Sequence, residues 1–242
     1  MLTRHSHSVA GHGRRILPAH ATTHNVIVVD SDYAKAPEYP FPIPYQDAED
    51  VVRWILNQSF TDPDKLTASG FSAGGAIALV MAGASGILPK GSIKHVIGFY
   101  NQVNRRQDAI FDLSRVKIPN GYPGTSLSPG LLNLFNSALL FPSHSRSDPH
   151  VSPYFLPPED FPPVTLISAQ FDGLQPQVED FAERLVKAGV DCKHLMIEKV
   201  GHMFLSACTD DKPEGRIGTP GGDGKRKAFA LVDQKLSEVY RR

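Results

Sequence analysis

Three residue types that together perform acyl transfer occur here in a suggestive order. Ser72 lies in the stretch GFSAGG, Asp172 follows PVTLISAQF, and His202 follows LMIEKVG. A serine hydroxyl is a weak nucleophile until a base takes its proton, and an imidazole base works best when a carboxylate orients it. The chemistry predicted is attack of Ser72 on a carbonyl carbon, with His202 as the base and Asp172 as the orienting acid.

The residues around Ser72 have the composition of a sharp turn between a strand and a helix. An apolar run ends before Ser72, and a row of small residues begins at Ala73. We expect Gly70 and Gly74 to remove side chains that would collide at the bend. The first N–H groups of a helix starting at Ala73 would face a developing oxyanion, so Ala73 and Gly74 are the candidate substrate-binding positions. The alternative interpretation is that Ser72 only caps this helix.

Asp172 and His202 each come just past the end of a predicted strand. Ligands collect at the carboxyl ends of parallel strands, and acid followed by histidine is the order typical of hydrolases whose serine sits on a strand-to-helix turn. Alone, Asp172 could be a helix cap and His202 an ordinary loop histidine. The order and the strand-end placement together favour the triad.

The rest of the chain alternates strand-like and helix-like patterns. Most of the β-branched runs are apolar on successive residues, as in strands covered on both faces. The predicted strands are residues 25–31, 65–71, 93–100, 163–170 and 192–200. Helical periodicity covers residues 45–58, 178–188 and 229–239, and Gly189 is expected to end the second helix in a left-handed cap. This alternation predicts an α/β fold with a mainly parallel sheet flanked by helices.

The length of 242 residues suits one domain. We expect residues 1–24 to form an irregular or partly helical arm and residues 25–242 to form the domain. Residues 112–162 are predicted to be a lid-like insertion, whose apolar LLNLFNSALLF would either cover an acyl group or pack as a structural helix. The glycine-rich residues 209–225 are predicted to be a flexible surface loop, because they depart from the phosphate-binding pattern they superficially resemble.

Charge and composition narrow the range of partners. The 25 basic residues balance the 25 acidic ones, which predicts no nucleic-acid partner and favours an uncharged or small one. Only Cys192 and Cys208 are present, which suits a reducing compartment. The histidine-rich N-terminus lacks metal-ligand spacing and has no signal-peptide core, and no segment is long and apolar enough to span a bilayer. We expect a cytoplasmic protein without stable membrane insertion, although the early Arg4, Arg14 and Arg15 weakly resemble a mitochondrial transit peptide.

Four stretches resemble the hormone-sensitive-lipase-like, or arylacetamide-deacetylase-like, branch of the α/β-hydrolases, which are esterases of small acyl and aryl esters. They are VVDSDYAKAPEYPFP, GFSAGGAIAL, SDPHVSPYF with FPPVTLISAQFDGL, and VGHMF. The resemblance runs from about Val26 to the C-terminus. It implies that Ser72 is the nucleophile, Asp172 the acid and His202 the base, with no metal or cofactor. Four residues match a structural turn of the family, namely Asp32, Tyr33, Pro37 and Glu38.

One family motif has no counterpart in this sequence. Family members carry, upstream of the first stretch, a strand ending in H-G-G-G whose N–H groups supply part of the oxyanion hole, and here only the N–H of Ala73 can be named. That strand would lie between residues 25–31 and 65–71, so we expect either direct pairing of these two or an open sheet edge. The sequence is interpreted as a shortened serine carboxylesterase. The alternative is a catalytically impaired relative that binds a small molecule.

Overall fold

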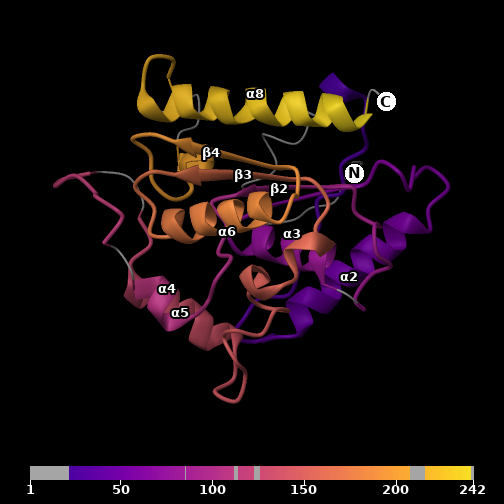
Figure 1. Ribbon diagram of the computed structural model, residues 1–242, viewed down its shortest axis with the longest axis horizontal. Helices are drawn as coiled ribbons and strands as arrows, with labels where there is room; N and C mark the ends of the chain where they lie inside the picture. Colours follow the sequence, from indigo (N-terminus) through magenta and orange to yellow (C-terminus); the bar gives the residue numbers. More distant parts are fainter. Residues whose placement is uncertain (1–21, 85, 112–113, 123–125, 208–215, 241–242) are drawn as a thin grey trace.

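The computed structural model describes residues 22–84, 86–111, 114–122, 126–207 and 216–240. Four parallel strands form one sheet in the order β1-β2-β3-β4. They are β1 (Thr67–Phe71), β2 (His95–Phe99), β3 (Val164–Ala169) and β4 (Cys192–Ile197). The predicted α/β class and parallel sheet are confirmed (Figure 1).

Helices cover both faces of this sheet (Figure 1). The helices α2, α3 and α6 lie on one face and α8 on the other, which explains why β2 and β3 are buried at every position. The helices are α2 (Ile43–Leu56), α3 (Ala73–Gly83), α4 (Gln107–Phe111), α5 (Pro129–Leu139), α6 (Gln175–Lys187), α7 (Phe204–Ala207) and α8 (Pro220–Tyr240), with 3-10 turns at η1 (Pro153–Phe155) and η2 (Pro158–Asp160). None of the helices described is both long and apolar enough to cross a bilayer.

β1 is an edge strand among the strands described. Its Ser69 is exposed, whereas the neighbouring β2 is buried throughout. The N–H of Ser72 donates to the carbonyl oxygen of Phe99 on the β2 side, at 2.8 Å. Because main-chain groups alternate in direction along a strand, Ser69 and Phe71 direct theirs to the opposite side. The expected open edge therefore lies beside β1.

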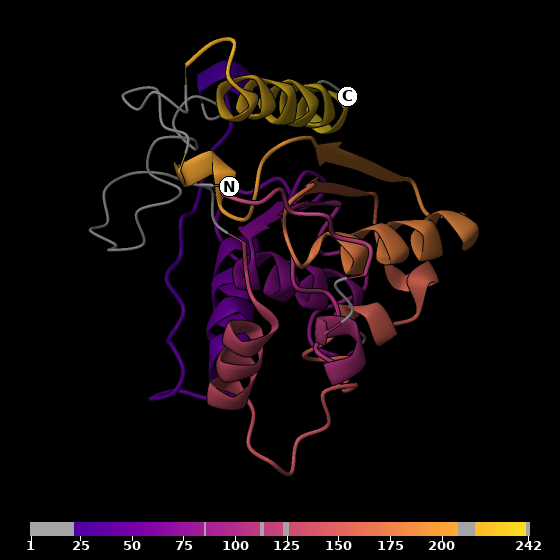
Figure 2. The ribbon, with the colours of Figure 1, turned by 90° about the vertical axis from the view of Figure 1, so that its left-hand side faces the viewer.

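The predicted strand at residues 25–31 is wrong. Asn25 lies in a turn, and residues 26–31 pair with no strand among the described residues, although Val28 is buried. Figure 2 shows this segment as a separate indigo trace alongside the molecule. A strand is defined by pairing with a neighbour, and here a cavity separates the segment from the edge of β1. The β-branched residues of this segment favour an extended backbone, but a strand also requires a hydrogen-bonded neighbouring strand.

The predicted loop at residues 209–225 is also wrong for its last six residues, where α8 begins at Pro220. The Thr219 hydroxyl accepts a hydrogen bond from the first turn of this helix. A Cβ on Gly224 would lie 2.4 Å from Cγ2 of Ile197 in β4. Glycine therefore lets the helix approach the sheet closely, and this packing outweighs its weak helix propensity.

The described part of the predicted insertion contains α5 and the turns η1 and η2. Helix α5 begins where the Ser128 hydroxyl accepts a hydrogen bond from the N–H of Leu131, at 3.2 Å. Gly189 has a φ of 83° just after α6, which confirms the left-handed cap. Of the predicted arm, residues 22–24 form a helical turn and residues 1–21 lie outside the described residues.

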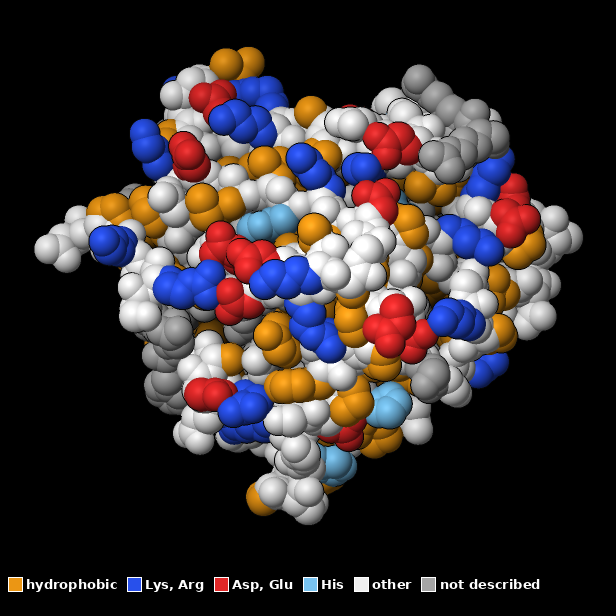
Figure 3. All heavy atoms as spheres, viewed as in Figure 1, with side chains coloured by type: hydrophobic (Ala, Val, Ile, Leu, Met, Phe, Trp, Pro, Cys, Tyr) orange, Lys and Arg blue, Asp and Glu red, His pale blue; other side chains and the backbone are white. Residues whose placement is uncertain are grey.

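The face shown in Figure 3 intersperses basic and acidic side chains, without a broad area of one sign. Among the ion pairs of the described residues, Arg115 contacts both Glu179 and Asp180 of α6, each at 2.6 Å. Exposed pairs of this kind add little stability each. This face therefore has no strong field that would attract a polyanion.

Substituting Gly224 tests the close packing of α8 on β4. We expect Gly224→Ala to lower the free energy of unfolding by about 1–3 kcal/mol, because the new methyl group must displace Ile197. Gly130→Ala is the matched control in α5, where a Cβ meets nothing within 4 Å, and should be neutral or stabilising. Urea unfolding of both variants measures this, and equal stability of the two would contradict the packing argument.

His95 is a buried histidine whose ring Nε2 lies 3.0 Å from the Thr165 hydroxyl. Burial, with a smaller contribution from the charge of Lys235, lowers the pKa of His95 to about 4. Between the ordinary histidine pKa of about 6.5 and this lower value, the unfolded chain binds a proton that the folded chain does not. Folding is therefore penalised as the pH falls through this window.

We expect the free energy of unfolding to fall between pH 7 and pH 5, with His95 contributing at most about 1.4 kcal/mol per pH unit. His95→Gln keeps a polar group near Thr165 but does not titrate, so its stability should fall less over the same interval. Urea titrations at both pH values measure the difference. Parallel losses in the two proteins would show that His95 is not the group responsible.

Candidate active site

The turn at Ser72 joins β1 to α3 with a strained backbone. Ser72 has φ 51° and ψ −116°, a conformation that costs a non-glycine residue about 1–3 kcal/mol. Its N–H is held by the carbonyl oxygen of Phe99. Its hydroxyl makes no capping hydrogen bond to α3, so the helix-cap interpretation of Ser72 is wrong.

Glycines make this turn sterically possible, but not in the predicted way. A Cβ on Gly70 would lie 2.4 Å from the backbone of Gly74, so Gly70 is required. A Cβ on Gly74 would meet only Cε1 of Tyr33, at 3.9 Å, so the expectation of a collision there is wrong. The second tight position is Gly75, where a Cβ would lie 1.9 Å from Nδ2 of Asn101. Sequence reasoning missed Gly75, although the row of small residues was visible.

The structure brings Ser72, Asp172 and His202 together in one hydrogen-bonded chain. Nε2 of His202 lies 3.1 Å from the Ser72 hydroxyl oxygen, and Nδ1 lies 2.7 Å from Oδ2 of Asp172. The serine follows β1, the aspartate β3 and the histidine β4, so three strand ends place them. Because an ionised carboxylate only accepts hydrogen bonds, Asp172 keeps the proton on Nδ1 and leaves Nε2 free to accept from Ser72.

Asp172 and His202 are held in a buried environment. Their side chains are 1% and 3% exposed. The second oxygen of Asp172 accepts from the N–H of Leu174 at 3.2 Å, so the aspartate also orders the turn before α6. The N-cap position of α6 is Leu174 and no side chain caps the helix, so the interpretation of Asp172 as a helix cap is wrong. Each carboxylate oxygen has a partner, which fixes the plane of the group.

Tyr100 supports the imidazole, and sequence reasoning missed it. Its ring packs edge-on against His202 with centroids 4.8 Å apart, and its N–H donates to the carbonyl oxygen of Ile167. Burial raises the pKa of Tyr100, and the charge of Asp172 adds to the effect. The phenol therefore stays neutral beside the imidazole. A tyrosine directly after a buried strand was the only available sequence signal.

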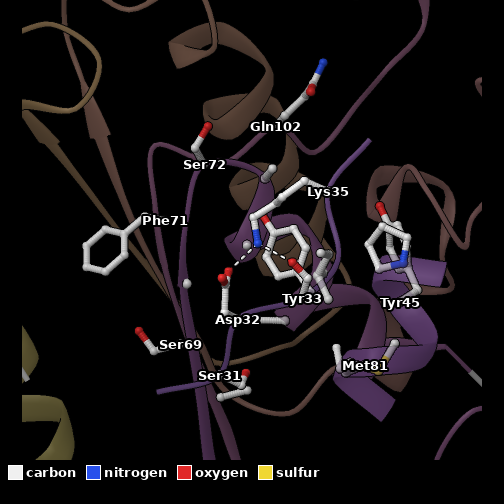
Figure 4. Close-up of a pocket in the computed structure, with 18 of the residues that line it drawn as sticks. Ser31, Asp32, Tyr33, Lys35, Tyr45, Ser69, Phe71, Ser72, Met81 and Gln102 are labelled. Atoms are coloured by element: carbon white, nitrogen blue, oxygen red, sulfur yellow. Dashed lines mark hydrogen bonds and ion pairs between the residues drawn. The ribbon is translucent and has the colours of Figure 1, made fainter. Parts of the chain in front are cut away.

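A cavity of about 850 Å³ opens beside Ser72. It lies between β1 and the extended segment 28–36, and Ala73, Gly74 and His202 line it with the serine. Ala73 and Gly74 are the first two residues of α3, and their role in substrate binding stays a prediction. Figure 4 shows Ser72, Tyr33 and Gln102 around it, with Lys35 bonded to Asp32 and to the carbonyl oxygen of Tyr33. Apolar walls come from α2, α3 and α5, including Val51, Ile55, Ile77, Met81, Leu131 and Phe135.

The predicted apolar piece of the insertion, now helix α5, is therefore part of the cavity wall. Leu132 is buried, while Leu131 and Phe135 remain partly exposed beside the cavity. Among the residues that the structure describes, no group of three His, Cys, Asp or Glu side chains could hold a metal ion. The site therefore places a serine hydroxyl, an imidazole and a carboxylate next to a largely apolar cavity.

Comparisons with known proteins agree with this geometry. The model of a family with the α/β-hydrolase fold matches residues 5–206. The chain is 28% identical over 204 residues to versiconal hemiacetal acetate esterase of Dothistroma septosporum, covering 79% of this chain and 60% of that protein. It is 28% identical over 180 residues to carboxylesterase NlhH of Mycobacterium tuberculosis, covering 71% of this chain and 54% of that protein. The chain thus spans little more than half the length of these relatives.

Solved esterases share the fold at low identity. Carboxyl esterase 2 of Tuber melanosporum superposes with a TM-score of 0.75 at 23% identity, covering 94% of this chain and 72% of that one. EstE1, a carboxylesterase cloned from a metagenomic library, gives a TM-score of 0.77 at 21% identity, covering 93% of this chain and 73% of that one. With the family match, the strand order and the residues at three strand ends, the chain belongs to the α/β-hydrolase fold family, in its hormone-sensitive-lipase-like branch.

Proposed function

We propose that this protein is a serine carboxylesterase that hydrolyses small acyl or aryl esters through an acyl-enzyme. The hydrogen-bonded chain from Ser72 through His202 to Asp172, at the wall of a largely apolar cavity, carries this proposal. The names of two relatives, an acetate esterase and a carboxylesterase, support ester hydrolysis as the reaction class.

In the first step, the Ser72 oxygen attacks the ester carbonyl carbon while Nε2 of His202 takes the hydroxyl proton. Asp172 stabilises the positive imidazolium that forms. The carbonyl oxygen becomes an oxyanion that faces the N-terminus of α3, with the N–H of Ala73 as the nearest expected donor. Collapse of this intermediate breaks the ester bond, and the imidazolium returns its proton to the departing alcohol.

In the second step, a water molecule attacks the acyl-enzyme carbonyl carbon. His202 takes one proton from this water and then returns it to the Ser72 oxygen as the acid leaves. The serine, the imidazole and the carboxylate are thereby restored. Both steps use protein groups and water alone, and the apolar cavity wall accommodates the hydrocarbon part of the ester.

Binding without turnover is a second candidate, favoured by one observation. The sequence contains no H-G-G-G motif, so the donors that family members present from that loop cannot be assigned to any residue here. Removing a single oxyanion donor slows comparable enzymes by about 10²- to 10³-fold. The measured rate of ester hydrolysis separates the two candidates.

Ser72→Ala should abolish hydrolysis of 4-nitrophenyl butyrate above the buffer rate, because no other residue takes the place of the nucleophile. Ser168→Ala is the matched control: Ser168 also bonds a histidine, His194, at 2.8 Å, but this pair links β3 to β4. The control should retain turnover.

Asp172→Asn should lower kcat by about a thousandfold or more, because Nδ1 of His202 loses its carboxylate acceptor. Release of 4-nitrophenolate measures all three, and equal rates for wild type and Ser72→Ala would refute the proposal.

A further inference from the structure

The cavity wall contains a buried arginine that the proposed chemistry does not use. Arg105 is 3% exposed, yet it lines the same cavity as Ser72. Its Nε donates to the carbonyl oxygen of Val151 at 2.8 Å. Its Nη1 donates to Oε1 of Gln102 at 2.6 Å and to Oδ1 of Asn136 at 2.7 Å. These bonds tie the segment after β2 to α5.

The acceptors of Arg105 are all neutral. None of the ion pairs formed by the described residues involves it, in contrast to the exposed Arg115, which contacts two carboxylates. A guanidinium stays protonated under physiological conditions, and a buried charge without a counter-ion is costly. A purely structural role explains the hydrogen bonds. These hydrogen bonds do not by themselves require the donor to be charged.

The same cluster has hydrogen-bond donors left over. Because arginine only donates, the side-chain oxygens of Gln102 and Asn136 must face it, which leaves both amide nitrogens as donors. Nε2 of Gln102 and Nδ2 of Asn136 are buried without a hydrogen-bond partner in the described part of the chain, and of these two residues only Gln102 lines the cavity. Nη2 of Arg105 has only the Tyr45 hydroxyl, at the limiting distance of 3.5 Å. A positive charge surrounded by unused donors is the environment that an anion requires.

This cluster lies close to the nucleophile turn. Gln102 and Arg105 line the cavity that Ser72 lines. Tyr33 lines it as well: Cε1 of its ring lies 3.9 Å from where a Cβ on Gly74 would be, and burial raises the pKa of Tyr33 while the nearby charge of Arg105 acts in the opposite direction.

Two carboxylates also border the cavity, but neither neutralises Arg105. Asp32 is paired with Lys35, and no ion pair among the described residues joins Asp30 or Asp32 to Arg105. The charge of Arg105 is therefore available to a ligand that enters the cavity.

We propose that the cavity accepts an anionic ester, whose carboxylate binds Nη2 of Arg105 and Nε2 of Gln102 while its ester carbonyl lies at Ser72. The proposal rests on the proposed esterase function for turnover, but not for binding. A carboxylate suits the site because its two oxygens can accept from two donors at once and supply the missing charge. The substrate class is then monoesters of dicarboxylic acids.

Turnover of matched esters tests the substrate class. We expect mono-4-nitrophenyl esters of dicarboxylic acids, from adipate to sebacate, to exceed their methyl-capped neutral counterparts in kcat/KM by about tenfold at the best length. Gln102→Glu places a carboxylate beside Arg105, which should preserve folding and remove the preference for the anionic ester. Gln58→Glu adds the same charge two residues past the end of α2, at a position that does not line the cavity, and should keep the preference.

Binding without turnover separates this proposal from the esterase proposal. We expect the free dicarboxylate of the best length to raise the Tm of wild type and of Gln58→Glu, but not of Gln102→Glu. If no ester is hydrolysed but this pattern of Tm shifts appears, the esterase function fails and the anion site stands. If neutral and anionic esters react equally and no shift appears, the anion site is overturned while the esterase function stands. A preference or shift that persists in Gln102→Glu also overturns it.

Discussion

The strained backbone of Ser72 is the constraint on which the site depends. The turn is held from one side by the N–H bond to Phe99 in β2 and from the other by backbone contact between Gly70 and Gly74. Neither restraint involves the serine side chain, so the hydroxyl is free to meet His202. The positive φ costs energy, and the sheet ladder together with the packed helix α3 offsets it. The reactive geometry is thus a consequence of the fold.

The cavity next to the Ser72 turn lies along the edge of β1 that no described strand pairs with. Because no described strand pairs with that edge, the extended segment 28–36 stands off from the sheet and the cavity occupies the space between them. The cavity has an apolar inner wall from α2 and α3, while Ser69 remains exposed to water at its outer side. Its polar lining includes Arg105 and Gln102, the pair Asp32 and Lys35, and the proposed nucleophile and base. The proposed anion-binding residues and the proposed nucleophile therefore line the same cavity.

Local patterns sufficed to predict the elements that carry the three polar side chains. Ser72 was recognisable from its flanking glycines, and Asp172 and His202 from their places after apolar runs, because a parallel sheet aligns strand ends. The Gly189 cap was predictable because it depends on one residue's conformation.

Features that depend on distant partners could not be predicted. Residues 25–31 have the composition of a strand, but pairing requires a neighbour that the local sequence does not reveal. The start of α8 depends on Gly224 fitting against Ile197, and the requirement for Gly75 depends on Asn101. The charge environment of Arg105 arises from Gln102, Asn136 and Val151, which come from three separate segments.

The strained turn at Ser72 makes its hydroxyl reactive, because it holds the oxygen beside His202. Fluorophosphonate labelling followed by peptide mass spectrometry measures this directly, because the probe attaches only to an activated serine. We expect one adduct, on Ser72, that is lost in Gly70→Ala and retained in Gly74→Ala, where a side chain has room. An adduct on another serine, or equal labelling of Ser72 in both glycine variants, would contradict it.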